Sequence, residues 1–458
     1  MQRVTEVLPV FRQGSNLFLV LTLLCAGAIC SAQERPTADE LLNDLACGSC
    51  HEGISVESDI LDKAADLSQA GLRYGPDYVF SYVLYPVKIR QYLGFSRMPI
   101  LYLDEREGLA LALYLHTLLP PGAEPPVYPM QESFAAVKAA HPDITPETGE
   151  DVFLSLGCIV CHQQSFSVEW DAKIGPDQSF EGARVTPGWL EEFLARPTPV
   201  RPFGFYPGSG SRHPDFQHTG SEVEVLGEYL RNQRGDLDTA TAYVEPDLFL
   251  RFSAIKAETL IREKQPCLGC HVLGDEGGRI GPDLSSLNSR LEPEFVSQVL
   301  TDPAGVLAET LMPKVDMPDT TLTLLVNYLV RQDFPRVESS YFSHIDNQPH
   351  FFQELEGAPG LYTKHCAPCH GIEGDANGYN AQFLPTVPTT HSDSAYMSTR
   401  PDDTLFDGVF SGGYILNKSH RMPPWGATLE RDQIWGLIGH IRQLCNCEGP
   451  AWSRDGRR

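Results

Sequence analysis

Eight of the twelve cysteines fall in four copies of one short pattern, in which two cysteines are separated by two residues and followed directly by a histidine. Cysteines at this spacing stand one helical turn apart on the same side of a chain. Two thiols so placed can bond the two vinyl groups of a porphyrin, and the adjacent imidazole can bind its iron. The pattern predicts haem attachment at Cys47 and Cys50, Cys158 and Cys161, Cys267 and Cys270, and Cys366 and Cys369, with His51, His162, His271 and His370 as iron ligands.

Two other chemistries also use paired cysteines. A thiol redox couple and half of a zinc site both contain Cys-x-x-Cys, but neither requires a histidine directly after every pair. The fourfold repetition therefore favours four covalently attached haem c groups.

The spacing of the four copies predicts an array of domains. Their first cysteines are 111, 109 and 99 residues apart, which is typical of tandem repeats. In each of the first three repeats we expect a helix that starts at a proline and stops at another, over 76–86, 187–197 and 293–303. An apolar segment of helical periodicity then closes each repeat, at 109–118, 223–230 and 322–330.

Candidates for a second iron ligand come from a shared register. Met98, His213 and Met312 each stand sixteen residues before a tyrosine of these closing segments, and each is followed by proline. A thioether or an imidazole can bind the side of an iron opposite a histidine. The register indicates this role, since a Met-Pro or His-Pro dipeptide alone is more often a plain loop.

Together these features resemble a tandem array of class I cytochrome c domains, and the resemblance covers nearly all of residues 37–447. It implies an all-α fold in which an N-terminal helix leads into each attachment pattern and a C-terminal helix crosses it. The residues that match are Gly149, Phe153, Gly157, Gly357, Leu361 and Tyr362 on N-terminal helices and Tyr114, Tyr229 and Tyr328 on C-terminal helices.

The resemblance also implies the ligand set: the four pattern histidines as proximal ligands, and Met98, Met312 and Met422 as distal ones. Met317 and Met397 are weaker candidates than Met312 and Met422. Residues 422–426 resemble the methionine loop of oxidase-associated and dehydrogenase-associated haem subunits.

A ligating histidine usually gives its other ring N–H to a fixed acceptor. In the family this is a proline carbonyl shortly after the pattern. Pro176 and Pro282 fit that role, Pro385 is a further candidate, and Ala65 occupies the aligned position of the first repeat.

The second repeat departs from the family because no methionine occurs between Gln131 and Leu311. We expect His213 to be the distal ligand of the second haem, with His218 or an open iron site as alternatives. Since methionine raises an iron potential relative to more basic donors, this haem is predicted to have the lowest potential of the four.

The expected organisation is a signal peptide over 1–32 and cytochrome c domains over 37–120, 147–235, 251–336 and 350–447. Arg3 and Arg12 precede an apolar run that is too short to span a bilayer, and small residues follow it. This predicts a cleaved signal, a periplasmic or otherwise exported protein, and no transmembrane segment in the mature chain.

A formal charge of −25 argues against nucleic acid as a partner. The expected partners are redox proteins, either basic or docked in a membrane complex. Electron relay is the expected function. The alternatives are a redox enzyme with catalysis at the second haem, or a haem subunit of a dehydrogenase or oxidase complex. Cys445 and Cys447 stand too close together for an easy disulfide, and no role is assigned to them.

Overall fold

The computed structural model describes residues 35–54, 60–90, 92–162, 175–200, 212–235, 251–307, 310–331, 334, 340–341, 343–345 and 356–453. This part of the chain is helix-rich, in agreement with the predicted all-α class. Its sheet is limited to β1 (Val272–Leu273) paired antiparallel with β2 (Glu276–Gly277). The segment predicted to be a signal peptide lies outside the described residues.

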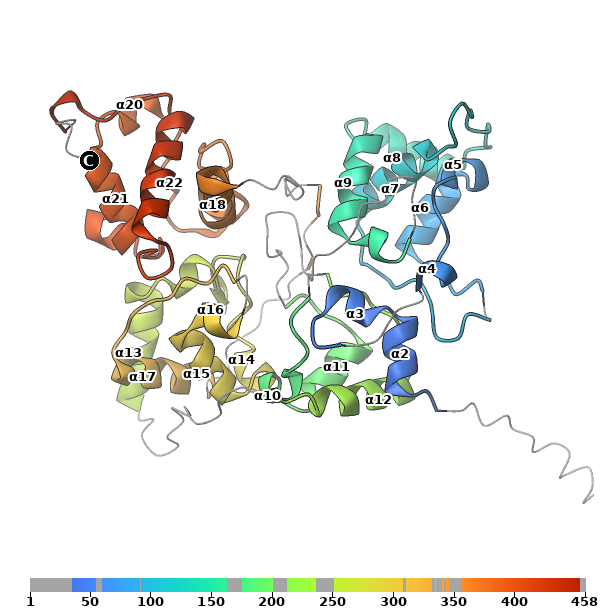
Figure 1. Ribbon diagram of the computed structural model, residues 1–458, viewed down its shortest axis with the longest axis horizontal. Coiled ribbons are helices and arrows are strands. Elements are labelled where there is room, and N and C mark those ends of the chain that lie inside the picture. Colours follow the sequence, from blue (N-terminus) through green and yellow to red (C-terminus); the bar gives the residue numbers. More distant parts are fainter. Residues whose placement is uncertain are drawn as a thin grey trace, which may run out of the picture.

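Buried apolar side chains form four clusters within the described residues, and each cluster contacts one attachment pattern. The helices accordingly gather into four units (Figure 1). We name them after the first cysteine of the pattern they contain: the Cys47, Cys158, Cys267 and Cys366 units.

The Cys47 unit combines segments from two distant parts of the sequence. Leu41, Leu42 and Leu45 share one apolar cluster with Leu226 and Leu230. The helices of this unit are α2 (Ala38–Asp44), α3 (Cys47–Cys50), α10 (Glu181–Arg184), α11 (Trp189–Ala195) and α12 (Gly220–Arg231).

The Cys158 unit is centred on a close crossing of two helices. Gly149 of α9 (Pro146–Ser155) lies against the backbone of Ala110 in α7 (Glu105–Thr117), and the rings of Tyr114 and Phe153 are 5.6 Å apart. The other helices of this unit are α5 (Ala70–Arg73), α6 (Pro76–Leu84), α8 (Glu132–Ala140) and the short η1 (Cys158–Val160). The short α4 (Ile60–Lys63) contacts α2 through the ion pair of Lys63 with Asp44.

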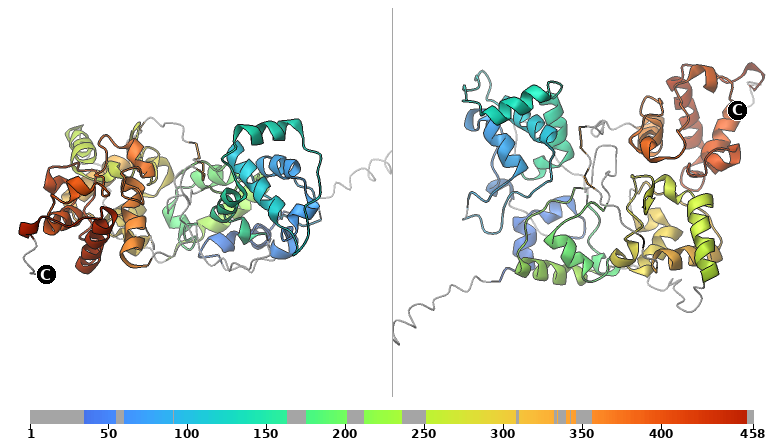
Figure 2. Two further views of the ribbon diagram at one scale, coloured as in Figure 1. Left: turned by 90° about the horizontal axis from the view of Figure 1, so that it is seen from above. Right: turned by 180° about the vertical axis from the view of Figure 1, so that it is seen from behind.

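These two units correct the domain boundaries expected at 37–120 and 147–235. Helices α2 and α3 lie with α11 and α12, whereas α5, α6 and α7 lie with α8 and α9 (Figures 1 and 2). The first two repeats have therefore exchanged their N-terminal helices and attachment patterns. Each C-terminal helix offers an apolar stripe that either N-terminal helix can cover, so local sequence does not specify the partner.

The Cys267 and Cys366 units are built from contiguous sequence. In the Cys267 unit the helices are α13 (Arg251–Thr259), η3 (Leu260–Lys264), η4 (Cys267–Gly269), α14 (Leu287–Arg290), α15 (Pro293–Thr301), α16 (Pro303–Val306) and α17 (Asp319–Leu329). In the Cys366 unit they are α18 (Gly357–His365), α19 (Ala367–His370), η5 (Tyr379–Phe383), α20 (Ser394–Met397), α21 (Asp402–Ser411), η6 (Gly413–Leu416), α22 (Arg431–Leu444) and η7 (Ala451–Ser453).

No helix in the described ranges is long and apolar enough to cross a membrane.

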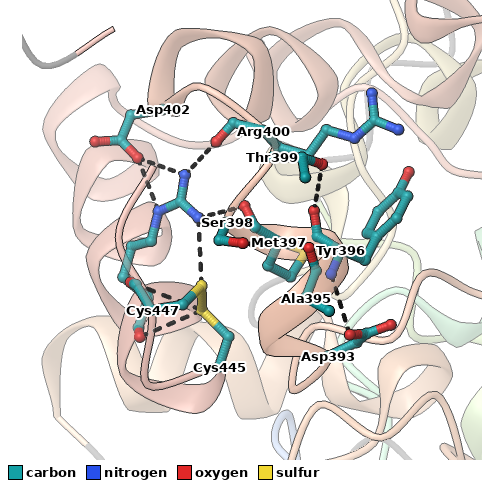
Figure 3. The surroundings of a disulfide bond; sticks show 11 residues. Asp393, Ala395, Tyr396, Met397, Ser398, Thr399, Arg400, Asp402, Cys445 and Cys447 are labelled. Carbon is teal, nitrogen blue, oxygen red and sulfur yellow. Dashed lines mark hydrogen bonds and ion pairs between the residues drawn. A yellow bond between two sulfur atoms is a disulfide. The ribbon is translucent and has the colours of Figure 1, made fainter. Parts of the chain in front are cut away.

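Cys445 and Cys447 are joined by a disulfide at the end of α22, which corrects the expectation that they are too close to pair (Figure 3). Their Cα atoms are 5.1 Å apart, a distance that a disulfide can bridge. Asn446 between them adopts a left-handed conformation, which lets the chain reverse in one residue. The guanidinium of Arg442 donates to Asp402 Oδ1 at 2.8 Å and to the Met397 carbonyl at 2.7 Å, which ties this end of the chain to α20 and α21.

Candidate functional site

The four pattern histidines share one hydrogen-bond geometry. Each ring places Nδ1 within 2.9 Å of a backbone carbonyl, to which it can donate when protonated at that nitrogen. The acceptors are Pro176 O for His51, Ala65 O for His162, Pro282 O for His271 and Thr389 O for His370. In His162, His271 and His370 the carbonyl fixes the tautomer and leaves the Nε2 lone pair free to bind a metal. In His51 the Nδ1 atom also lies 3.0 Å from Gln178 Nε2.

Burial favours the same neutral form. It lowers the pKa of His162, His271 and His370 below the ordinary value, although the carbonyl hydrogen bond acts in the opposite direction. A neutral imidazole is the form that ligates iron.

The carbonyls that accept from the histidines agree with the predicted one in the third repeat and differ from the predicted ones in the other repeats. Pro282 serves the histidine of its own pattern, as predicted. Pro176 serves His51 instead of His162, and Ala65 serves His162. Both changes follow from the exchange of the first two N-terminal segments, and in the fourth repeat Thr389 takes the place predicted for Pro385.

His213 faces the first pattern and not the second. Its ring centroid is 6.2 Å from that of His51. Two metal–nitrogen bonds of about 2 Å and two ring radii of about 1.2 Å would separate the centroids of two axial imidazoles by roughly 6 Å. Burial, with His51 nearby, lowers the pKa of His213 to about 3, so the ring is neutral. The structure thus places the ring of His213 beside His51, whereas the sequence predicted that it lies beside His162.

Met98 shows the reciprocal arrangement. It packs against the cluster of the Cys158 unit, which also contacts Cys158 itself. The two candidate ligands have thus changed places relative to the attachment patterns, each lying across from the pattern of the other repeat.

The two ligand loops cross as an antiparallel pair. Ile100 N–H donates to Asp215 O at 2.8 Å, and Asp215 N–H donates to Ile100 O at 2.9 Å. An arginine precedes each ligand candidate and reaches an acidic residue of the other repeat's C-terminal helix. Arg97 donates to both carboxylate oxygens of Glu222 at 3.0 and 2.9 Å, and Arg212 donates to both of Glu107 at 2.8 Å.

The two clamps differ in burial. The side chains of Arg212 and Glu107 are 2% and 0% exposed, and burial raises the pKa of Glu107 despite the nearby guanidinium. Burial also acts to raise the pKa of Glu222, but hydrogen bonds from Arg97 and Thr219 outweigh it and the pKa is lowered. His218, the alternative distal ligand, belongs to the same network, because its Nδ1 lies 3.3 Å from the Arg97 guanidinium.

Met312 and Met317 both line the cavity of the Cys267 unit. Met317 packs against the apolar cluster. Met312 keeps a register with the helix that follows: Met98, His213 and Met312 each stand seven residues before the first residue of α7, α12 and α17.

In the Cys366 unit, sequence reasoning missed a buried histidine beside the proximal ligand. The His391 ring stacks on that of His370 with centroids 4.1 Å apart and planes 10° apart. The Tyr362 hydroxyl lies 2.9 Å from His391 Nδ1 and holds the ring in place. Met422, the predicted ligand, contacts the apolar cluster, whereas Met397 is fully buried within it.

The surroundings of the cysteines fit a covalently held apolar group. Burial is the main cause that raises the pKa of Cys47, Cys158, Cys161 and Cys366 to about 12 and that of Cys267 to about 11, so these thiols are not poised as thiolates. One cavity of about 2860 Å³ runs past the first three patterns and reaches Leu361 and Pro423 of the Cys366 unit.

Residues that sequence reasoning missed are the clamps and the contacts between units. A signal for the clamps was present, because Glu107 and Glu222 occupy the third position of capping boxes that begin at Asp104 and Thr219. Nothing in the local sequence marks His391 as a partner of His370.

A family model described as cytochrome C oxidase, cbb3-type, subunit III matches residues 353–441. Neither a curated protein nor a solved structure matches the chain. The matched segment contains the attachment pattern at 366–370 and the predicted ligand Met422. The chain thus contains a c-type cytochrome domain, which implies covalently bound haem c, electron transfer and redox protein partners.

Proposed function

We propose that the protein is an exported tetrahaem c-type cytochrome that relays single electrons between redox protein partners. The observation that carries the proposal is the common geometry of the four pattern histidines, each with Nδ1 held by a backbone carbonyl. Three of these patterns lie outside the segment matched by the family model, and this geometry makes them equivalent to the fourth.

The residues that would hold each haem follow from the contacts. Cys47, Cys50 and His51 would hold the first, with His213 opposite; Cys158, Cys161 and His162 the second, with Met98. Cys267, Cys270 and His271 would hold the third with Met312, and Cys366, Cys369 and His370 the fourth with Met422. The haem iron supplies reversible one-electron chemistry, while the chain excludes water and fixes the ligands.

This assignment moves the lowest potential from the second site to the first. His213 faces His51, so the haem bonded at Cys47 and Cys50 is the one with two imidazole ligands. Two ligands on each iron leave no position for a substrate, which favours relay over catalysis.

Contacts between units support an order of sites that differs from the order in the sequence. Burial raises the pKa of Cys161 and the nearby Cys50 adds to that rise, so the first two patterns are neighbours. The Cys47 unit joins the Cys267 unit through the bridge between Val185 and Leu291. The last two patterns are neighbours, because Asn380 donates to both Gly269 O and Cys369 Sγ. Burial raises the pKa of Cys270, and the nearby Cys369 adds to that rise. The supported order is second, first, third, fourth.

Two paired variants of the full chain test the proposal. Cys47→Ser with Cys50→Ser should remove one haem from the intact mass together with the bis-imidazole signal in electron paramagnetic resonance. Cys158→Ser with Cys161→Ser should remove one haem and leave that signal intact. A wild-type mass without four haem increments contradicts the tetrahaem proposal. Loss of the bis-imidazole signal in the second variant contradicts only the assignment of His213 to the first site and leaves the tetrahaem proposal standing.

The match at 353–441 also favours a role as haem subunit of an oxidase complex. Copurification of stoichiometric partner subunits under mild detergent would support that role. A protein that purifies alone and exchanges electrons freely with a soluble carrier would contradict it.

A further inference from the structure

We propose that Asn380 joins the third and fourth attachment sites into a direct electron-transfer junction. The inference rests on the proposed function and deepens it, because it names the contact that couples two of the four sites. Asn380 lies in η5, ten residues after the fourth pattern, and is 0% exposed.

All of the hydrogen-bonding capacity in the Asn380 amide is directed at the two patterns and their surroundings. Nδ2 donates to Gly269 O at 2.7 Å and to Cys369 Sγ at 3.3 Å. Oδ1 accepts from Arg279 N–H at 2.8 Å. The amide orientation follows from these partners, because only the nitrogen can donate to the carbonyl and only the oxygen can accept from the N–H.

The surfaces that flank Asn380 pack with backbone against backbone. A Cβ added to Gly269 would lie 2.0 Å from Arg421 O, and one added to Gly278 would lie 2.4 Å from Gly269 O. The guanidinium of Arg421 also donates to Leu268 O at 3.3 Å. Glycine before the second cysteine of the third pattern therefore permits a close approach that the other three patterns, with Ser49, Val160 and Pro368 there, would not.

These contacts define a short route between the sites. It runs from Cys270 along one peptide unit to Gly269 O, through the two N–H groups of Asn380 Nδ2, and to Cys369 Sγ. Haems bonded at the two patterns would exchange one electron along this route. The iron that His271 would hold would go from ferrous to ferric, and the iron that His370 would hold would go from ferric to ferrous. No covalent bond changes and no proton moves.

A purely structural role is the competing explanation, since a buried amide with three partners also stabilises a fold. The two roles differ in what they alter. A structural amide affects the free energy of unfolding alone. A donor to the thioether sulfur would also place the positive end of an N–H dipole beside the edge of the porphyrin, which favours the reduced state and so raises the potential of the fourth site.

The experiment follows electron redistribution within the full-length holoprotein after substoichiometric pulse-radiolytic reduction. The phase between the third and fourth sites is identified as the one whose amplitude changes in a Met422→His variant. We expect Asn380→Leu to slow this phase several-fold and to lower the potential of the fourth site in a redox titration. Asn380→Asp keeps the acceptor for Arg279 but loses both donors, and should behave like the leucine variant.

Gln382→Leu is the matched control, because Gln382 is an exposed amide of the same η5 and donates within it, to Tyr379 O. Its redistribution rate and potentials should equal those of the wild type. Gly269→Ala provides a second approach that leaves Asn380 in place, and it should slow the same phase by separating the two units. Wild-type rates and potentials in the leucine and aspartate variants, with four haems attached by mass, would overturn the junction while leaving the relay proposal standing.

Discussion

At the scale of single residues, the site that a distal ligand serves is decided by the pattern histidine that lies opposite it. The rings of His213 and His51 lie at the separation that two axial imidazoles require, and burial lowers the pKa of His213 to about 3. The pattern histidines and cysteines were predictable because their chemistry is local. The partner of His213 was not, since nothing within that segment records which pattern lies across the cavity.

Replacing His213 by methionine should raise the potential of the site bonded at Cys47 and Cys50. A thioether is a weaker donor than an imidazole, and axial ligands set haem potentials over about 0.8 V, so a rise of roughly 0.1–0.3 V is expected. A redox titration with spectra measures it. In the matched variant Met98→His the potential of the Cys158 site should fall; a rise at the Cys158 site in the His213 variant would contradict the assignment.

The buried pair of Arg212 and Glu107 gives a second prediction at this scale. Glu107→Gln should lower the free energy of unfolding by about 3–5 kcal/mol, because it leaves a guanidinium buried without its counter-charge. Chemical denaturation monitored by circular dichroism measures the loss.

Glu224→Gln is the control for that variant. Glu224 pairs with Arg35 at 3.0 Å, but the two side chains are 65% and 53% exposed, and exposed pairs contribute little. An equal loss in both variants would mean that the clamp does not hold the crossed loops together.

At the scale of helices, proline signals predicted two of the three expected starts. α6 and α15 begin at Pro76 and Pro293, as expected. The helix expected from Pro187 begins instead at Trp189, because Gly188 has a φ of +88° that no helix accommodates. The exchanged pairing could not be predicted, since the first two repeats offer similar apolar stripes and the choice between them depends on contacts more than a hundred residues apart.

The crossing of α7 and α9 can be tested through Gly149. An added Cβ would lie 2.0 Å from Ala110 O, so Gly149→Ala should destabilise the Cys158 unit by about 1–3 kcal/mol although alanine favours helix. Thermal unfolding followed at the absorbance of the haem measures this.

Gly439→Ala in α22 is the control, because nothing lies within 4 Å of its added Cβ. There the gain in helix propensity of about 0.5–1 kcal/mol should stand unopposed. Stabilisation of both variants would contradict the close crossing, and with it the exchange of N-terminal segments.

At the scale of the whole molecule, contacts between the four units, and not their order in the sequence, decide which units are neighbours. The clamps and the crossed loops unite the first two units, a bridge between Val185 and Leu291 attaches the third, and Asn380 attaches the fourth. Within the chain only the segment matched by the family model was independently recognisable as a cytochrome c domain, and the equivalence of the other three rests on the geometry around their histidines.

The exchange of segments also determines the order in which the sites can form while the chain is synthesised. His162, Met98 and Ala65 have all been synthesised once residue 162 has been added, whereas His51 must wait for His213, 162 residues after it. At about 5–20 residues per second, that wait lasts roughly 10–30 s. The pocket that comes second along the chain is thus completed first, and the earliest imidazole to be synthesised spends that interval facing water.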